Sequence, residues 1–127
     1  MRGIIFGVVV VAAIAAAGFA TGEASASAAP SCYAHVQTQT GNFTGVVGAN
    51  YHTSCPFARN VAQASLRNII ASGGRYHGPL TTSAYSPVTG MWYRVNCSAN
   101  GDLYLGAMNA DCQAGIGAHV TYRAWSD

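Results

Sequence analysis

The clearest pattern of hydrophobic and polar positions along the chain is helical and covers residues 56–72. Apolar and small side chains fill one broad arc of a helical wheel, which predicts an amphipathic helix lying on a core. Ser54 or Cys55 can cap this helix, Pro56 suits its first turn because no N–H donor is needed there, and Gly73 ends it. Its solvent face is expected to carry Arg59, Asn60, Gln63 and Arg67.

Alternation of apolar and polar side chains predicts β-strands on both sides of this helix. Before it, a short strand near Tyr33 leads into a glycine-rich loop (Gly41, Gly45, Gly48), with a further strand piece near Val46. After it, residues 81–97 predict a hairpin. The rest is expected as a tight turn at Asn100-Gly101, a strand over 103–108, a bend over 109–117 that carries Cys112, and a last strand over 118–124.

Together these elements predict an α+β fold in which one helix packs on a small antiparallel sheet. If the strands after the helix pair in register, one sheet face carries two tryptophans beside two arginines and no acid: Trp92, Arg94, Arg123 and Trp125. Arginine offers a fork to carboxylate or phosphate, and tryptophan offers a flat apolar plate, so this face suits an anionic or sugar-like ligand. A register slip of one residue would turn all four side chains toward the core.

The start of the chain does not belong to this domain. A short positive start, an apolar stretch over residues 4–20 and small residues after it predict a secretory signal peptide over residues 1–28, cleaved after Ala26 or Ala28. Residues 29–127 then form a single exported domain, and no second apolar stretch of membrane-spanning length follows. We therefore expect a secreted protein of the extracellular space or the cell envelope.

The charge pattern excludes several kinds of partner and site. Arginines are spread along the exported part and lysine is absent, which argues against nucleic-acid binding. Paired-carboxylate catalysis could use only Asp102 and Asp111. The histidines have no metal-binding spacing, so we expect neither a metal nor another cofactor; they are His35, His52, His77 and His119.

All four cysteines lie in the exported part, and an even number in a short secreted chain predicts two disulfides. Three pairings are possible. We favour Cys32–Cys55 with Cys97–Cys112, because each bridge then closes a short loop between adjacent elements. Each would stabilise the fold by about 2–4 kcal/mol.

Two motifs are more specific than these general patterns. Residues 53–61 read T-S-C-P-F-A-R-N-V at the start of the helix, and residues 86–90 read S-P-V-T-G. In these motifs and in the two later cysteines, the chain resembles a group of small secreted proteins of mycobacteria and related actinobacteria. The resemblance covers roughly residues 53–122 and departs at residues 113–115, which read Gln-Ala-Gly where the group has Gly-Gly-Asn. It implies export, compact size and disulfides, and it assigns no catalytic residue.

Cys55 is the strongest candidate for catalysis, because a helix start favours a thiolate. With His119 on a later strand as the base and an aspartate to orient it, the site would resemble that of a papain-like thiol hydrolase. The even number of cysteines argues against this, since it gives Cys55 a disulfide partner.

These observations favour a non-catalytic binding module over an enzyme. The sequence leaves its partner open among a cell-envelope glycan, a lipid headgroup and an extracellular protein. The thiol hydrolase is one alternative. A peptidase inhibitor that presents the loop Ser86–Gly90 is the other.

Overall fold

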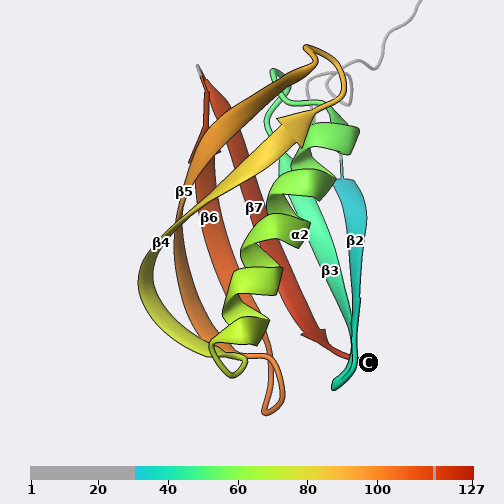
Figure 1. Ribbon diagram of the computed structural model, residues 1–127, viewed down its shortest axis with the longest axis vertical. Helices are drawn as coiled ribbons and strands as arrows, with labels where there is room; N and C mark the ends of the chain where they lie inside the picture. The colour runs from blue at the N-terminus through green and yellow to red at the C-terminus, as the bar shows by residue number, and fades with distance from the viewer. Residues whose placement is uncertain (1–30, 116) are drawn as a thin grey trace, which may run out of the picture.

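The computed structural model describes residues 31–115 and 117–127, so the expected signal peptide over residues 1–28 lies outside the described residues. The described strands form one antiparallel sheet in the order β2-β3-β7-β6-β5-β4 (Figure 1). The elements along the chain are β2 (Ser31–Thr38), β3 (Gly41–Ala49), α2 (Cys55–Ala71), β4 (Arg75–Ser86), β5 (Met91–Asp102), β6 (Met108–Ala114) and β7 (Ala118–Ser126). The predicted helix and antiparallel sheet are confirmed.

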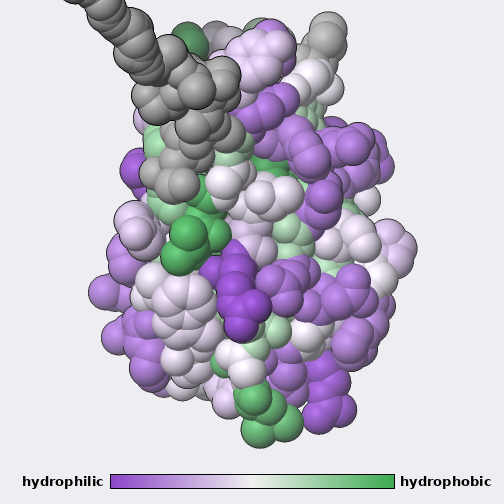
Figure 2. Space-filling view, turned by 180° about the vertical axis from the view of Figure 1, so that it is seen from behind, coloured by the Kyte–Doolittle hydropathy of each residue, from purple (hydrophilic) through white to green (hydrophobic). Residues whose placement is uncertain are grey.

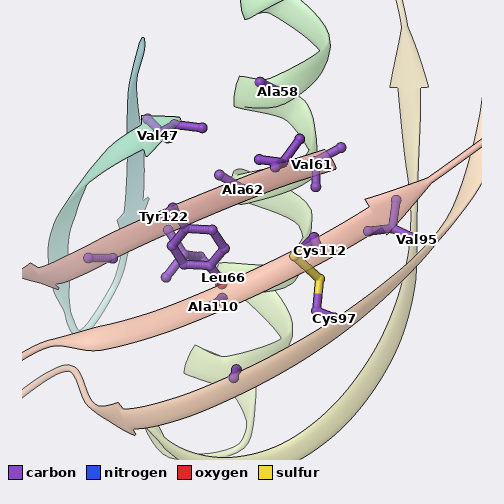
Figure 3. Close-up of a cluster of buried hydrophobic side chains, with 14 of the residues drawn as sticks. Val47, Ala58, Val61, Ala62, Leu66, Val95, Cys97, Ala110, Cys112 and Tyr122 are labelled. Atoms are coloured by element: carbon purple, nitrogen blue, oxygen red, sulfur yellow. A yellow bond between two sulfur atoms is a disulfide. The ribbon is translucent and has the colours of Figure 1, made fainter. Parts of the chain in front are cut away.

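The sheet curls around α2, so that both of its edge strands, β2 and β4, contact the helix (Figure 1). Apolar residues of α2 and of all six strands form one buried cluster. In this cluster Val61 and Leu66 of the helix lie against Tyr122 of β7 and against the strands beside it (Figure 3). The two disulfides are Cys32–Cys55, which ties β2 to the start of α2, and Cys97–Cys112, which joins β5 to β6. The favoured pairing is confirmed.

The glycine-rich loop expected after the first strand is wrong, because two of its glycines lie inside β3. An added Cβ at Gly45 would meet the Cβ of Ala124 at 3.5 Å, and one at Gly48 would meet Oγ1 of Thr121 at 3.2 Å. The contact at Gly45 would be an ordinary van der Waals contact, whereas the one at Gly48 would be tight, so the missing side chain of Gly48 helps β7 to pair closely with β3.

The boundaries expected after residue 97 are also wrong. Strand β5 runs on to Asp102, the chain turns over residues 103–107, and β6 occupies most of the expected bend. Gly101 does not form the turn but pairs with Met108 in the β5–β6 ladder, and glycine is required there because an added Cβ would collide with the carbonyl oxygen of Ala107. The turn forms three residues later, where Oδ1 of Asp102 accepts the N–H groups of Tyr104 at 2.9 Å and Leu105 at 3.1 Å.

Three of the four helix residues expected to face solvent instead bind the edges of the sheet. Nε of Arg59 donates to the carbonyl oxygen of Tyr33 on β2 at 3.0 Å. Nε2 of Gln63 donates to the carbonyl oxygen of His35, two residues further along β2, at 3.1 Å. On the opposite edge, Nδ2 of Asn60 donates to the carbonyl oxygen of Tyr85 on β4 at 2.8 Å. Unpaired edge carbonyls are thereby satisfied within the protein.

One polar contact lies inside the core. Ser65 of α2 donates from its buried Oγ to the hydroxyl oxygen of Tyr122 at 2.7 Å. Burial of the phenol raises the pKa of Tyr122 to about 12, and the hydrogen bond with Ser65 opposes this shift. The folded protein therefore strongly favours the neutral phenol.

We expect the free energy of unfolding to decrease between about pH 10 and about pH 12. The pKa of Tyr122 is about 12 in the folded protein and about 10 for a tyrosine in an unfolded chain. Because the folded pKa is the higher one, the stabilisation is complete below pH ~10 and is lost as the pH rises toward 12, by roughly 3 kcal/mol. Urea denaturation of the wild type and Tyr122→Phe across this range measures it. An equally steep loss of stability in Tyr122→Phe would contradict the assignment.

Candidate functional site

The four side chains assigned to one binding face lie on the same side of the sheet, the side turned away from α2. We call this side the outer face. Trp92 and Arg94 lie on it along β5, and Arg123 and Trp125 lie on it along β7. Trp92 is 69% exposed, and Trp125 is half-buried.

The register separates the two tryptophan–arginine pairs along the strands. Arg123 faces Asn109 on β6, and Asn109 faces Asn100 on β5. Asn100 follows Trp92 by eight residues on the same strand, which corresponds to about 26 Å. The structure therefore places the two pairs in different parts of the outer face and does not form one cluster from them.

Arg123 lies in a shallow groove, about 720 Å³ in volume, that crosses the outer face from β3 over β7 and β6 to β5. We call it the outer groove. The ladder pairings arrange its side chains in two neighbouring rows. One row is Val46, Arg123, Asn109 and Asn100, and the other is Gly48, Thr121, Asp111 and Ser98. The second row contains a glycine and a serine, and these small residues leave room between the rows.

Most polar side chains of the outer groove are free to bind a ligand. In the described part of the chain, those of Ser98, Asn109, Thr121 and Arg123 form no hydrogen bond or ion pair with another residue. Asp111 and Asn100 are the exceptions: Oδ1 of Asp111 lies 2.7 Å from Nε2 of His119, and Oδ1 of Asn100 lies 3.4 Å from Nδ1 of His77. Hydrophilic side chains prevail over the outer face, and few hydrophobic ones interrupt them (Figure 2). The outer groove thus offers unsatisfied donors and acceptors on a rigid sheet.

Cys55 cannot act as the nucleophile of a thiol hydrolase in this structure, because its sulfur is bonded to that of Cys32. His119 lies on the outer face instead, where it contacts Asp111. No described cysteine is free.

The second carboxylate, Asp102, lies apart from Asp111. Asp111 faces Ser98, and Asp102 lies four residues further along β5, about 13 Å away. This exceeds the separations of roughly 5–9.5 Å that paired-carboxylate glycosidases use. Asp102 instead forms an ion pair with Arg75 at 3.3 Å. The hydrogen bond from the N–H of Tyr104 holds the pKa of the Asp102 carboxyl below its usual range.

The loop Ser86–Gly90 is a tight turn, closed by a hydrogen bond from the N–H of Gly90 to the carbonyl oxygen of Ser86 at 2.8 Å. Ser86 is buried, and its Oγ accepts the N–H of Thr89 at 3.4 Å. The exposed part of this loop is therefore short and held by these two hydrogen bonds.

Residues 31–115 and 117–127 contain no group of three or more His, Cys, Asp or Glu side chains that could hold a metal ion. The same residues contain no helix long and apolar enough to cross a membrane.

Comparison of the chain with family models, with curated proteins and with solved structures gives no match. The resemblance to small actinobacterial secreted proteins therefore stays a prediction from the two motifs.

We expect no cysteine of the non-reduced protein to react with a thiol reagent. Its intact mass should be about 4 Da below that of the reduced protein, since each of the two disulfides removes two hydrogens. Mass spectrometry after alkylation, with and without prior reduction, measures both. Alkylation of Cys55 in the folded, non-reduced protein would contradict the structure and restore the thiol hydrolase.

Proposed function

We propose that the protein is a secreted, non-catalytic binding module of the cell envelope, and that the outer groove binds a glycan. The observation that carries this proposal is a groove on a rigid sheet in which Ser98, Asn109, Thr121 and Arg123 have no hydrogen-bonding partner within the described residues. Two disulfides are compatible with an extracellular location.

The chemistry of the groove suits the hydroxyl groups of a sugar. Each hydroxyl both donates and accepts, and so do the amides of Asn100 and Asn109 and the hydroxyls of Ser98 and Thr121. Among the described residues that line the groove, Arg123 is the one cation and Asp111 the one acid, so the charges balance. A ligand of balanced polarity therefore fits better than a polyanion.

An aromatic ring lies beside the polar rows. Tyr33 faces Val46, which in turn faces Arg123 across β3 and β7. Tyr33 is 59% exposed, and its ring offers an apolar surface on which a sugar ring can stack. A protein partner would call for a largely apolar centre, whereas Val46 is the one exposed large apolar side chain among the described groove residues.

We expect Arg123→Ala and Asn109→Ala each to weaken binding to isolated cell-wall glycan by about tenfold, because a hydrogen bond that involves a charged or buried polar group contributes roughly 1–3 kcal/mol. Co-sedimentation with insoluble cell-wall material measures the affinity, and thermal unfolding checks that the variants are folded.

The matched control is Arg67→Ala, which removes an exposed arginine of α2 with no partner among the described residues. It should bind like the wild type. Equal affinities for wild type, Arg123→Ala and Asn109→Ala would refute the groove as the binding site. An equal loss of affinity in Arg67→Ala would show that binding depends on the net positive charge of the protein and not on the groove.

A further inference from the structure

A second surface of the protein lies at the end of the β4–β5 hairpin and is independent of the outer groove. Val95 is the last residue of β5 toward this end that pairs with β6, through Ala114. Residues 83–94 therefore extend past the rest of the sheet and pair with each other alone. We call these residues the hairpin tip, which lies at one end of the molecule (Figure 1).

The inner side of the hairpin tip is fixed to the body of the protein. The ring of Tyr93 packs edge-on against that of Phe57 in α2, with the centroids 5.5 Å apart. The hydroxyl of Tyr93 also donates to Oγ1 of Thr89 at 3.1 Å, and Ala84 is buried. The tip is thus a rigid projection.

The outer side and the end of the hairpin tip expose large apolar side chains. Val88 is 71% exposed, Trp92 69% and Met91 56%. The ring of Tyr85 lies against that of Trp92, with the centroids 5.5 Å apart. Tyr85 and Trp92 lie on the outer side, whereas the sulfur of Met91 lies 4.0 Å from the hydroxyl of Tyr93 on the inner side, so the apolar side chains surround the end of the hairpin. Exposed apolar side chains gathered at one end of a domain mark a surface for a membrane or for a partner protein.

The order of these side chains along the hairpin favours a membrane over a partner protein. Val88 and Met91 lie at the end, Tyr85 and Trp92 lie directly behind them as facing residues, and Arg94 follows. Arg94 lies about 10 Å behind Met91 along the strand. A lipid monolayer presents the matching order: hydrocarbon, then the interface at which Trp and Tyr side chains of membrane proteins gather, then phosphate.

We propose that the hairpin tip inserts into the surface of an anionic lipid bilayer, with Val88 and Met91 deepest, Trp92 and Tyr85 at the interface, and Arg94 at the headgroup phosphates. Arg94 is the single Asp, Glu, Lys or Arg residue between Arg75 and Asp102. The tip therefore meets a negative surface without an opposing carboxylate of its own, and one arginine near such a surface adds modest attraction.

A peptide partner that adds a strand to the hairpin fits less well. Two edges are open at the tip, a short one at residues 91–94 of β5 and the longer edge of β4. On the β4 edge the carbonyl oxygen of Tyr85 already accepts a hydrogen bond from Asn60. A strand added there would have to displace this contact.

The two tryptophans allow a direct test with the disulfide-bonded secreted protein and vesicles of equal parts phosphatidylcholine and phosphatidylglycerol. Trp92 and Trp125 are the two tryptophans of the chain, so Trp125→Phe leaves Trp92 as the single reporter. In that variant we expect a blue shift of the emission on addition of vesicles, and quenching by brominated lipid. Trp92→Phe, which reports from Trp125 in the distant part of the outer face, should show no shift.

A matched pair of substitutions tests the depth order. Val88→Asp should weaken vesicle co-sedimentation by about tenfold or more, since a charge is costly below the interface. The control is Leu105→Asp, at an 82% exposed leucine in the turn at the other end of β5, and it should bind within about twofold of the wild type. Arg94→Gln should weaken binding to the anionic vesicles and leave weak binding to pure phosphatidylcholine unchanged.

Three outcomes would overturn the proposal: no sedimentation of the wild type with anionic vesicles, a blue shift that comes from Trp125, or an equal loss in Val88→Asp and Leu105→Asp. Both substituted side chains are exposed, and thermal unfolding of each variant confirms that a loss of binding is not a loss of fold. Because none of these variants alters the outer groove, glycan binding remains measurable whichever result is obtained.

Discussion

The packing of α2 against β2, β3, β4 and β7 is the constraint that shapes the rest of the structure. A flat six-stranded sheet would leave its outermost strands uncovered, so the sheet curls until β2 and β4 both contact α2. Close approach requires small residues at the contact, such as Ala58 and Ala62, both fully buried. The curl also brings both sheet edges within reach of polar helix side chains, which satisfy edge carbonyls that would otherwise be open to other strands.

The sequence predicted those elements whose pattern is local. The helix begins and ends within one residue of its predicted bounds, since a proline, a cap and two glycines mark its ends. The side-chain faces of β5 and β7 follow from alternation alone. Strand β6 was missed although it alternates buried Met108 and Ala110 with exposed Asn109 and Asp111, a signal that its low β-propensity conceals. Gly48 of β3 was misread as part of a loop because the tight contact that favours glycine there is with Thr121 of the distant strand β7.

The candidate sites show the same division between local pattern and distant pairing. Alternation places Arg123 and Trp92 on one face, but their separation depends on which strands are neighbours and in which register. The groove around Arg123 arises from rows that cross four strands, and no sequence window contains such a row. The helix residues Arg59, Asn60 and Gln63 show a related limit, because a polar helix position gives no indication of whether water or an edge carbonyl receives its hydrogen bond.

The position of β7 has a consequence for the way the chain reaches this structure. It lies between β3 and β6, so the hairpin of β2 and β3 shares no ladder with the rest of the sheet until the last strand has been synthesised. The Cys32–Cys55 bridge holds that hairpin to the helix independently of β7. Pairings between strands this distant in sequence form slowly, so the bridge, once formed, shortens the search that β7 has to complete.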